Sequence, residues 1–203
     1  MGKILRFAHP DMPVCYNRLA IRHYENGNYG EAEILLQKCL KIEEYLLGKD
    51  HPDIAATVNN LAVLYARQGR NEEAEQLFRR GLAIEERYLG TNHPDTAASV
   101  SNLAVLYEKQ GRYREAEFFF RRGLAIEEKT LGQNHPDTTV SMNNLAVLYA
   151  KQGKHQKAVS LFQQAWNIVK KAVPDNPNAE IIKKNHNCIR RKLCGTKEAN
   201  GSF

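Results

Sequence analysis

Residues 51–92 read HPDIAATVNNLAVLYARQGRNEEAEQLFRRGLAIEERYLGTN, and residues 93–134 repeat them with 30 identities in 42 positions. The triplet His-Pro-Asp marks four copies, since it begins at residues 9, 51, 93 and 135. Glycine keeps the same register in all four, at residues 27, 69, 111 and 153. A fixed period of this length is typical of repeat architectures, in which each unit buries its apolar face against its neighbours.

Each copy predicts a pair of helices. Apolar residues recur at helical spacing over residues 58–65 and again over residues 74–89, and Gly69 and Gly90 follow these two stretches. Pro52 and Asp53 suit a helix start. Proline costs nothing in the first turn, and a carboxylate can cap the helix or meet the positive end of its dipole. Helix pairs exclude a WD40 propeller, which has a similar period but needs four strands in each copy.

Small residues narrow the choice among helical repeats. Alanine stands at residues 20, 62, 104 and 146, and again at residues 32, 74, 116 and 158. Glycine inside a helix costs up to about 1 kcal/mol relative to alanine, so we expect close helix approach to offset this cost at Gly81 and Gly123. Tetratricopeptide, HEAT and armadillo repeats all pair helices at this period. The order Leu-Ala-x-x-Tyr, glycine, alanine and phenylalanine is the tetratricopeptide pattern.

Four stretches carry a closer resemblance. They are Asn-Asn-Leu-Ala-Val-Leu-Tyr from residue 59, Glu-Ala-Glu from residue 73, Leu-Ala-Ile-Glu-Glu from residue 82 and Leu-Gly-Thr-Asn-His-Pro-Asp from residue 89. Over roughly residues 9–173, which make up four repeats, the chain resembles the 42-residue tetratricopeptide repeats of kinesin light chain, and also nephrocystin-type and bacterial repeats of this class. The expected fold is all-α: a right-handed α-solenoid of four tetratricopeptide helix pairs plus a C-terminal capping helix.

The repeat register predicts the domain boundaries. Residues 1–8 form an N-terminal extension, and the four units cover residues 9–50, 51–92, 93–134 and 135–174. Terminal units of a solenoid must cover exposed apolar faces, so we interpret residues 175–194 as a capping helix that places Ile182, Ile189 and Leu193 on one face. Residues 195–203 are expected to form a disordered tail.

Charge and composition limit the classes of function. The net charge is +6, and the segment from Lys183 to Lys197 contains six basic residues and no acid, which leaves 23 basic and 23 acidic residues elsewhere. A large nucleic-acid surface would need basic residues across a face, so nucleic acid is an unexpected partner. No apolar run reaches the ~18 residues of a membrane span, and the N-terminus lacks a secretory signal. We therefore expect a cytoplasmic protein without membrane insertion, with its four cysteines reduced.

No catalytic or metal-binding motif is found. The histidines of the four triplets, His9, His51, His93 and His135, belong to successive repeats whose helices pack ~8–10 Å apart. A zinc ion holds its ligands at about 2 Å, so these histidines cannot share one, and we interpret them as loop and helix-start residues. With no phosphate loop, His-Glu-x-x-His or nucleophile elbow, the chain is predicted not to be an enzyme and to need no cofactor, metal or small-molecule substrate.

The resemblance implies a peptide-binding groove, because the first helix of each tetratricopeptide pair lines the concave face. The residues that it places there are Asn17, Arg18, Asn59, Asn60, Val63, Arg67, Ser101, Asn102, Val105, Lys109, Asn143, Asn144, Val147 and Lys151. We hypothesise that Asn60, Asn102 and Asn144 pair with the main chain of an extended peptide, since a carboxamide both donates and accepts. The alternative is that these asparagines bond neighbouring helices to one another.

The charge of the bound peptide stays open. Arg67, Lys109 and Lys151 would favour acidic peptides, as the resemblance to kinesin light chain implies. Where kinesin light chains often read Ile-Arg-Glu, however, this chain places Glu43, Glu85 and Glu127, which predicts an acidic groove edge. These charges could instead form a solvated face.

The sequence thus predicts a non-catalytic scaffold or adaptor that binds an extended peptide or a short helix of a partner protein. One alternative is a structural module that self-associates through the solenoid ends or the convex face. The other is weak binding of nucleic acid or an acidic surface through the basic C-terminal segment.

Overall fold

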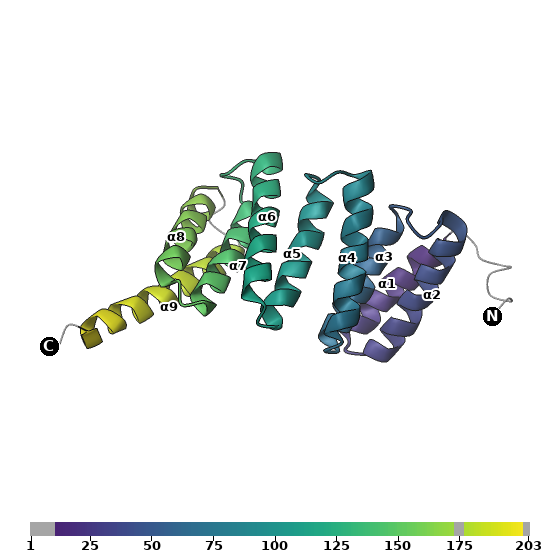
Figure 1. The fold of residues 1–203 in the computed structure, drawn as a ribbon, viewed down its shortest axis with the longest axis horizontal. Helices are drawn as coiled ribbons and strands as arrows, with labels where there is room; N and C mark the ends of the chain where they lie inside the picture. Colours follow the sequence, from purple (N-terminus) through teal and green to yellow (C-terminus); the bar gives the residue numbers. More distant parts are fainter. Residues whose placement is uncertain (1–10, 173–176, 201–203) are drawn as a thin grey trace. The chain divides into compact units, whose positions relative to one another are not determined.

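The computed structural model describes residues 11–172 and 177–200, which form nine α-helices and no strand (Figure 1). The helices are α1 (Met12–Glu25), α2 (Tyr29–Leu47), α3 (Ile54–Arg67), α4 (Asn71–Tyr88), α5 (Pro94–Lys109), α6 (Tyr113–Leu131), α7 (Thr138–Lys151), α8 (His155–Ala172) and α9 (Pro177–Asn200). They confirm the all-α helix pairs and the C-terminal helix. None of the described helices is long and apolar enough to cross a membrane.

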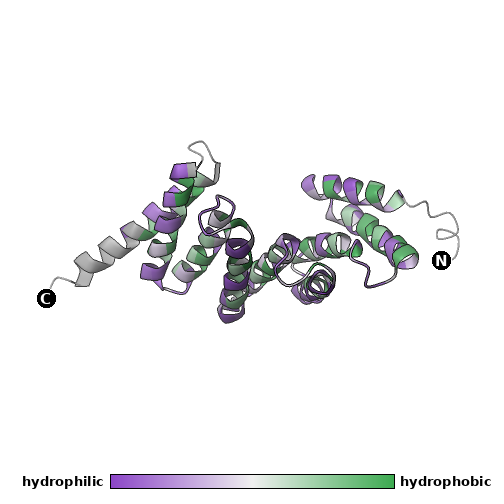
Figure 2. Ribbon diagram, turned by 90° about the horizontal axis from the view of Figure 1, so that it is seen from above, coloured by the Kyte–Doolittle hydropathy of each residue, from purple (hydrophilic) through white to green (hydrophobic). Residues whose placement is uncertain are grey.

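The chain divides into two compact units. The first extends to Thr91 and contains α1–α4, and the second begins at Asn92 and contains α5–α9. In the first unit α1 packs on α2, α2 on α3 and α3 on α4. In the second unit the same order holds from α5 to α8, and α9 packs on both α8 and α7. Figure 2 shows apolar and polar residues alternating along α1–α8, and each of these helices buries one side in its unit.

Two kinds of glycine turn define each repeat. Gly69 joins α3 to α4 with φ +79°, and Gly90 follows α4 with φ +94°. Both values lie in the left-handed region, which residues with a Cβ rarely adopt. The glycines that the sequence predicts to end the helices therefore do so for a conformational reason.

The histidine of the repeated triplet accepts a backbone hydrogen bond at the start of the helix that follows, and His93 is the N-cap residue of α5. His93 Nδ1 accepts a hydrogen bond of 3.2 Å from the backbone N–H of Asp95, and His51 and His135 accept equivalent bonds. The sequence predicts that the aspartate caps the helix or meets the positive end of its dipole. Asp53 stands at the N-cap position of α3 but makes no side-chain capping bond, and Asp95 lies in the first turn of α5. Two residues of separation let the imidazole reach the free amide. The helix-start interpretation of these three histidines is confirmed, and His9 lies outside the described residues.

Half-buried carboxylates join successive helix pairs within each unit. In the first unit Glu33 on α2 accepts hydrogen bonds from Arg70 (2.8 Å) and Gln68 (3.2 Å), which lie beyond α3. In the second unit Glu117 on α6 accepts from Lys154 (2.9 Å) and Tyr149 (3.2 Å). Each carboxylate therefore fixes the next helix pair against its own.

The C-terminal helix buries one face and exposes a mostly polar one, on which Ile181 is the exposed large apolar side chain among the described residues. Ala179, Ile182, His186 and Ile189 are buried, which confirms the predicted role of Ile182 and Ile189. Lys184, Asn187 and Arg191 are exposed, although they stand 42 residues after Met142, Leu145 and Tyr149, which α7 buries. A helix with this pattern closes the apolar side of α7 and α8.

Two predicted boundaries at the C-terminus differ from the structure. The capping helix was expected to end at residue 194, but α9 extends to Asn200, so residues 195–200 of the expected tail are helical. The side chain of Leu193 and residues 201–203 lie outside the described part of the chain, as do residues 1–8 of the predicted extension. Cys15, Cys39 and Cys188 are free thiols, as predicted, and nothing is described of the side chain of Cys194.

Candidate peptide-binding site

A cleft of about 580 Å³ opens in the first unit between α1, the end of α2 and the start of α3. The residues that line it are Pro13, Val14, Asn17, Arg18, Ile21, Glu43, Leu46, Leu47, Asp53, Ala56, Thr57 and Asn60. The set includes Asn17, Arg18 and Asn60 of the predicted groove and Glu43 of the predicted acidic edge. The structure therefore brings these four predicted residues together on one surface.

The apolar part of this cleft is unusually exposed. Val14 and Ile21 on α1 are 61% and 45% exposed, and Leu46 and Leu47 at the end of α2 are each 42% exposed. Apolar side chains that gather around a concavity gain free energy when a ligand covers them, at about 25 cal/mol for each Å² removed from water. Leu46 and Leu47 were not predicted, because the resemblance assigns the groove to the first helix of each pair and these two residues end a second helix.

Two asparagines of the cleft bond to each other. Asn60 Nδ2 donates to Asn17 Oδ1 at 2.9 Å, and Asn17 Nδ2 donates to the hydroxyl oxygen of Thr57 at 3.4 Å. The alternative interpretation of the asparagines, as bonds between neighbouring helices, therefore holds for this pair. Since a carboxamide has two N–H donors and an oxygen acceptor, Asn60 still keeps one N–H and its oxygen for a ligand.

The other predicted groove residues of α3 have different surroundings. Asn59 donates to Glu85 Oε1 on α4 at 3.0 Å, so it serves the helix pair. Val63 is half-buried, and the exposed Arg67 donates from Nε to the Tyr24 hydroxyl at 2.9 Å. That hydrogen bond raises the pKa of Arg67 and leaves its charge available to a ligand.

In the second unit the predicted residues of α7 lie beside α9. Asn143 Oδ1 accepts from Asn185 Nδ2 at 2.9 Å, a contact between residues 42 positions apart. Val147 and Lys151 line a smaller cleft of about 240 Å³ together with Cys188 and Ile189.

The remaining predicted side chains of this unit are less uniform. Lys151 Nζ forms an ion pair of 2.6 Å with Glu108 on α5. The side chain of Asn144 makes no hydrogen bond to another described residue. On α5 the side chains of Ser101, Asn102 and Val105 are half-buried and Lys109 is exposed. Asn60 thus belongs to the first unit, while Asn102 and Asn144 belong to the second.

The predicted acidic edge is not an exposed row. Glu43 and Glu85 are buried, and Glu127 is half-buried. Ser141 Oγ donates to Glu127 Oε1 at 2.9 Å, and one further oxygen each of Glu43 and Glu127 is buried without a hydrogen-bond partner. Burial raises the pKa of Glu127, and the nearby charge of Asp137 raises it further against the hydrogen bond from Ser141.

Burial likewise raises the pKa of Glu43, against its hydrogen bond to Thr57. Glu43 lies beside the start of α3, and Glu127 lies beside Ser141 on α7. Each of these two follows a buried isoleucine by one residue. Of the three, Glu43 is the one that lines the cleft between α1 and α3.

Within the described residues, no group of three or more histidine, cysteine, aspartate or glutamate side chains is arranged to hold a metal ion.

The tetratricopeptide repeat family model matches residues 11–85, 53–129 and 120–171, so the chain belongs to the tetratricopeptide repeat family. Its helix pairs are of the kinesin light chain type. The chain is similar to a kinesin light chain of Podospora anserina with nearly identical TPR-like repeats, at 30% identity and a TM-score of 0.81 over 96% of this chain and 93% of that one. No curated protein sequence matches the chain.

Two more distant structures share the fold. BtubC (BKLC) from P. vanneervenii has 21% identity and a TM-score of 0.79, over 92% of this chain and 74% of that one. The pilF protein of Pseudomonas aeruginosa has 19% identity and a TM-score of 0.66, over 91% of this chain and 70% of that one.

Proposed function

We propose that the chain is a non-catalytic interaction scaffold of the cytoplasm that binds an extended peptide or short helix of a partner protein. The observation that carries the proposal is the cleft between α1 and α3, which combines exposed Val14 and Ile21 with the polar groups of Arg18 and Asn60. Apolar anchors with a few placed polar groups are typical of peptide-binding surfaces. A cargo-binding role like that of a kinesin light chain is the finer form of this proposal.

The polar groups of the cleft fit a peptide main chain. The free N–H and oxygen of Asn60 can pair with one peptide unit, and the exposed guanidinium of Arg18 can bind a carbonyl or a carboxylate. Each such hydrogen bond contributes about 0.5–1.5 kcal/mol. The apolar rim therefore supplies most of the affinity, and the polar groups supply orientation.

The test is panning of a random peptide library against the wild type and a Val14→Glu/Ile21→Glu variant. Both positions are exposed, so the fold tolerates the change, and Ile34→Glu on α2, where the isoleucine is 47% exposed outside the cleft, is the matched control. Peptides enriched by the wild type should bind the double variant more than about tenfold more weakly, since two anchors bring about 1.5–3 kcal/mol each. The Ile34→Glu control should bind them unchanged.

A second variant, Asn60→Ala/Asn102→Ala/Asn144→Ala, tests the asparagine hypothesis across both units. Enriched peptides that bind it as tightly as the wild type contradict that hypothesis. Enrichment by neither the wild type nor the control contradicts the groove proposal. In that case, a mass that rises with concentration favours self-assembly. Salt-dependent RNA binding that is lost when residues 174–203 are removed favours the basic C-terminal segment.

A further inference from the structure

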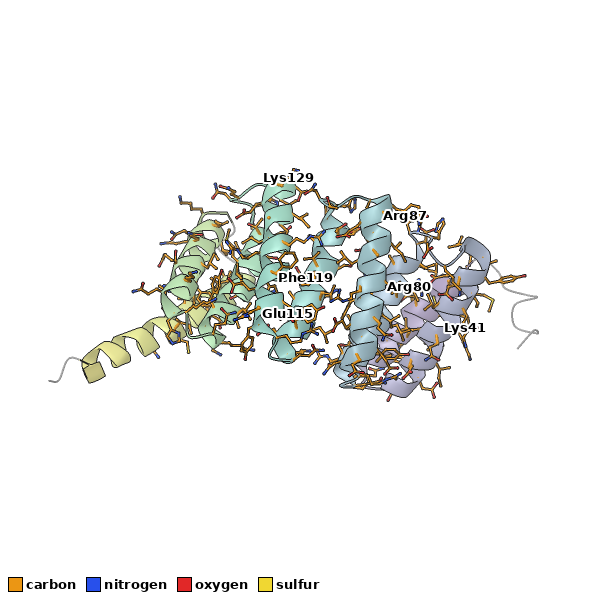
Figure 3. The ribbon with its side chains drawn as sticks, in the orientation of Figure 1. Lys41, Arg80, Arg87, Glu115, Phe119 and Lys129 are labelled. Atoms are coloured by element: carbon orange, nitrogen blue, oxygen red, sulfur yellow. The ribbon has the colours of Figure 1, made fainter. Side chains whose placement is uncertain are left out.

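An arginine links the two helix pairs of the first unit. Arg80, which Figure 3 labels on α4, contacts the preceding helix pair. Its Nη2 donates to Glu44 Oε1 at 2.7 Å and to the backbone carbonyl oxygen of Lys49 at 2.6 Å. Both side chains of the ion pair are partly buried. The guanidinium thus joins the end of α2 and the turn after it to α4, through a charge-assisted bond that is stronger than a neutral one.

The second unit keeps the acceptors of this contact and lacks the arginine. Counting 84 residues onward, which is two repeats, places Glu128 at the position of Glu44, Gln133 at that of Lys49 and Gln164 at that of Arg80. Glutamine is shorter than arginine by more than one bond and carries no charge, so it cannot replace the guanidinium. No ion pair joins Glu128 to another residue of the described chain.

A cleft of about 740 Å³ occupies this place. The residues that line it are Glu128, Gln133, Asn134, Met142, Gln164, Asn167, Ile168 and Lys171, from α6, the α6–α7 connection, α7 and α8. Ile168 is half-buried and offers apolar surface to the stem of a side chain, and Met142, which is 4% exposed, lies beneath it at the floor of the lining. It is a different surface from the cleft between α1 and α3.

Four carboxamides line the same cleft. Gln133, Asn134, Gln164 and Asn167 are all exposed, and Asn167 Oδ1 accepts from Gln163 at 3.0 Å. A carboxamide pairs with the N–H or C=O of a peptide unit. Lys171 is exposed on the lining and places a positive charge near the site, which disfavours a ligand with several cations.

We propose that this cleft binds one arginine side chain of an extended segment of a partner protein. The guanidinium of the ligand takes the place that Arg80 fills in the first unit. It donates to the Glu128 carboxylate and to the backbone carbonyl oxygen of Gln133. Its methylene stem lies on Ile168, with Met142 beneath. The planar guanidinium, which can donate to two acceptors at once, favours arginine over lysine.

The test uses the full chain and the tripeptide acetyl-Gly-Arg-Gly-amide, with its citrulline analogue as the neutral isostere. Binding is followed through the side-chain amide NMR signals of Gln133, Gln164 and Asn167. The arginine peptide should shift these signals, and the citrulline peptide should bind about tenfold to a hundredfold more weakly, because a hydrogen bond to a charged group is lost. Equal affinity for the two peptides overturns the proposal.

Three variants locate the site. Glu128→Gln should weaken the arginine peptide at least about tenfold. Gln164→Arg should abolish binding, because the introduced guanidinium fills the site from within, and a variant that binds as tightly as the wild type overturns the proposal. Arg80→Gln, once circular dichroism shows that it is folded, should gain a second site beside Glu44. If Arg80→Gln does not fold, the other two variants decide.

Discussion

At the scale of single residues, the close approach of α3 explains why a glycine stands at position 81 in the middle of α4. A Cβ at this position would collide with the carboxamide of Asn59 on α3. Asn59 in turn donates to Glu85 at 3.0 Å, so it cannot move aside without losing a bond to a charged group. Gly123 has the same relation to Ser101, whose Oγ would lie 2.9 Å from an added Cβ. The close helix approach predicted at these two glycines is confirmed.

We predict that Gly81→Ala destabilises the protein by about 1 kcal/mol. Alanine gains up to about 1 kcal/mol of helix propensity, but displacing Asn59 costs about 1.5–3 kcal/mol because its partner is charged. The control is Gly30→Ala on α2, where an added Cβ meets nothing within 4 Å, and this change should be stabilising. Urea denaturation measures both, and a stabilised Gly81→Ala protein would show that Asn59 moves freely.

The carboxyl of Glu127 makes stability depend on pH. Its pKa is raised in the folded chain by burial, so the fold favours the neutral form. The stability this contributes is present below the unfolded pKa of about 4.3 and is lost as the pH rises through the folded value. Glutamine is neutral throughout. The melting temperature of Glu127→Gln should therefore exceed that of the wild type by more at pH 7.5 than at pH 4.5.

Glu72→Gln is the matched control for this change, because Glu72 is exposed at the start of α4. It should show no such increase with pH. A Glu127→Gln protein whose advantage is the same at both values would mean that the carboxyl ionises in the fold as it does in the unfolded chain.

Individual side chains are where the sequence is least informative. Asn17 pairs with Asn60, and the predicted acidic row is buried at Glu43 and Glu85 and half-buried at Glu127, although the same residue types suit a groove lining equally well. Helical spacing tells which face a residue lies on, but not whether a neighbouring helix or a ligand covers it. The contact of Arg80 with Glu44 is even less predictable, since 36 residues separate the two.

At the scale of helices, α9 shows how a helix without a partner of its own is held. Its buried face follows a spacing of three and four residues, from Ala179 through Ile182 and His186 to Ile189. Helical periodicity predicts Ile182 and Ile189 correctly. It does not predict the end of the helix at Asn200, because glycine at position 195 is an ordinary signal for a helix stop and here does not act as one.

We predict that Ile182→Ala destabilises the protein by about 2–5 kcal/mol, because it leaves a cavity under α9. The neighbouring residue provides the control. Ile181 is 53% exposed whereas Ile182 is 1% exposed, so Ile181→Ala should change stability by less than about 0.5 kcal/mol. Equal effects of the two substitutions would contradict the packing of α9 on α7 and α8.

At the scale of the whole molecule, the period of 42 residues predicts helix number, order and pairing. It does so because each repeat is one helix pair that cannot bury its apolar face alone. The period says less about the binding surface. The predicted groove residues divide between two compact units, and in the first unit Leu46 and Leu47 from a second helix of a pair join the cleft.

Stability in such an array should be local. Phe162 on α8 is fully buried, and Phe162→Ala should cost about 3–5 kcal/mol. Because each repeat contacts only its neighbours, we expect amide hydrogen exchange to accelerate in α7–α9 and to stay unchanged in α1–α4. Phe118→Ala, at a 63% exposed position, is the control and should change neither. Uniform acceleration throughout the chain would show that the array unfolds as one cooperative body.

The polar outer face of α9 also limits where such an array of repeats can be lengthened by gene duplication. A further helix pair appended after this helix would meet Lys184, Asn187 and Arg191 where an apolar seam is required. A duplicated copy can therefore lengthen the array only if it is inserted upstream of α9. The second and third copies, with 30 identities in 42 positions, both lie upstream of α9.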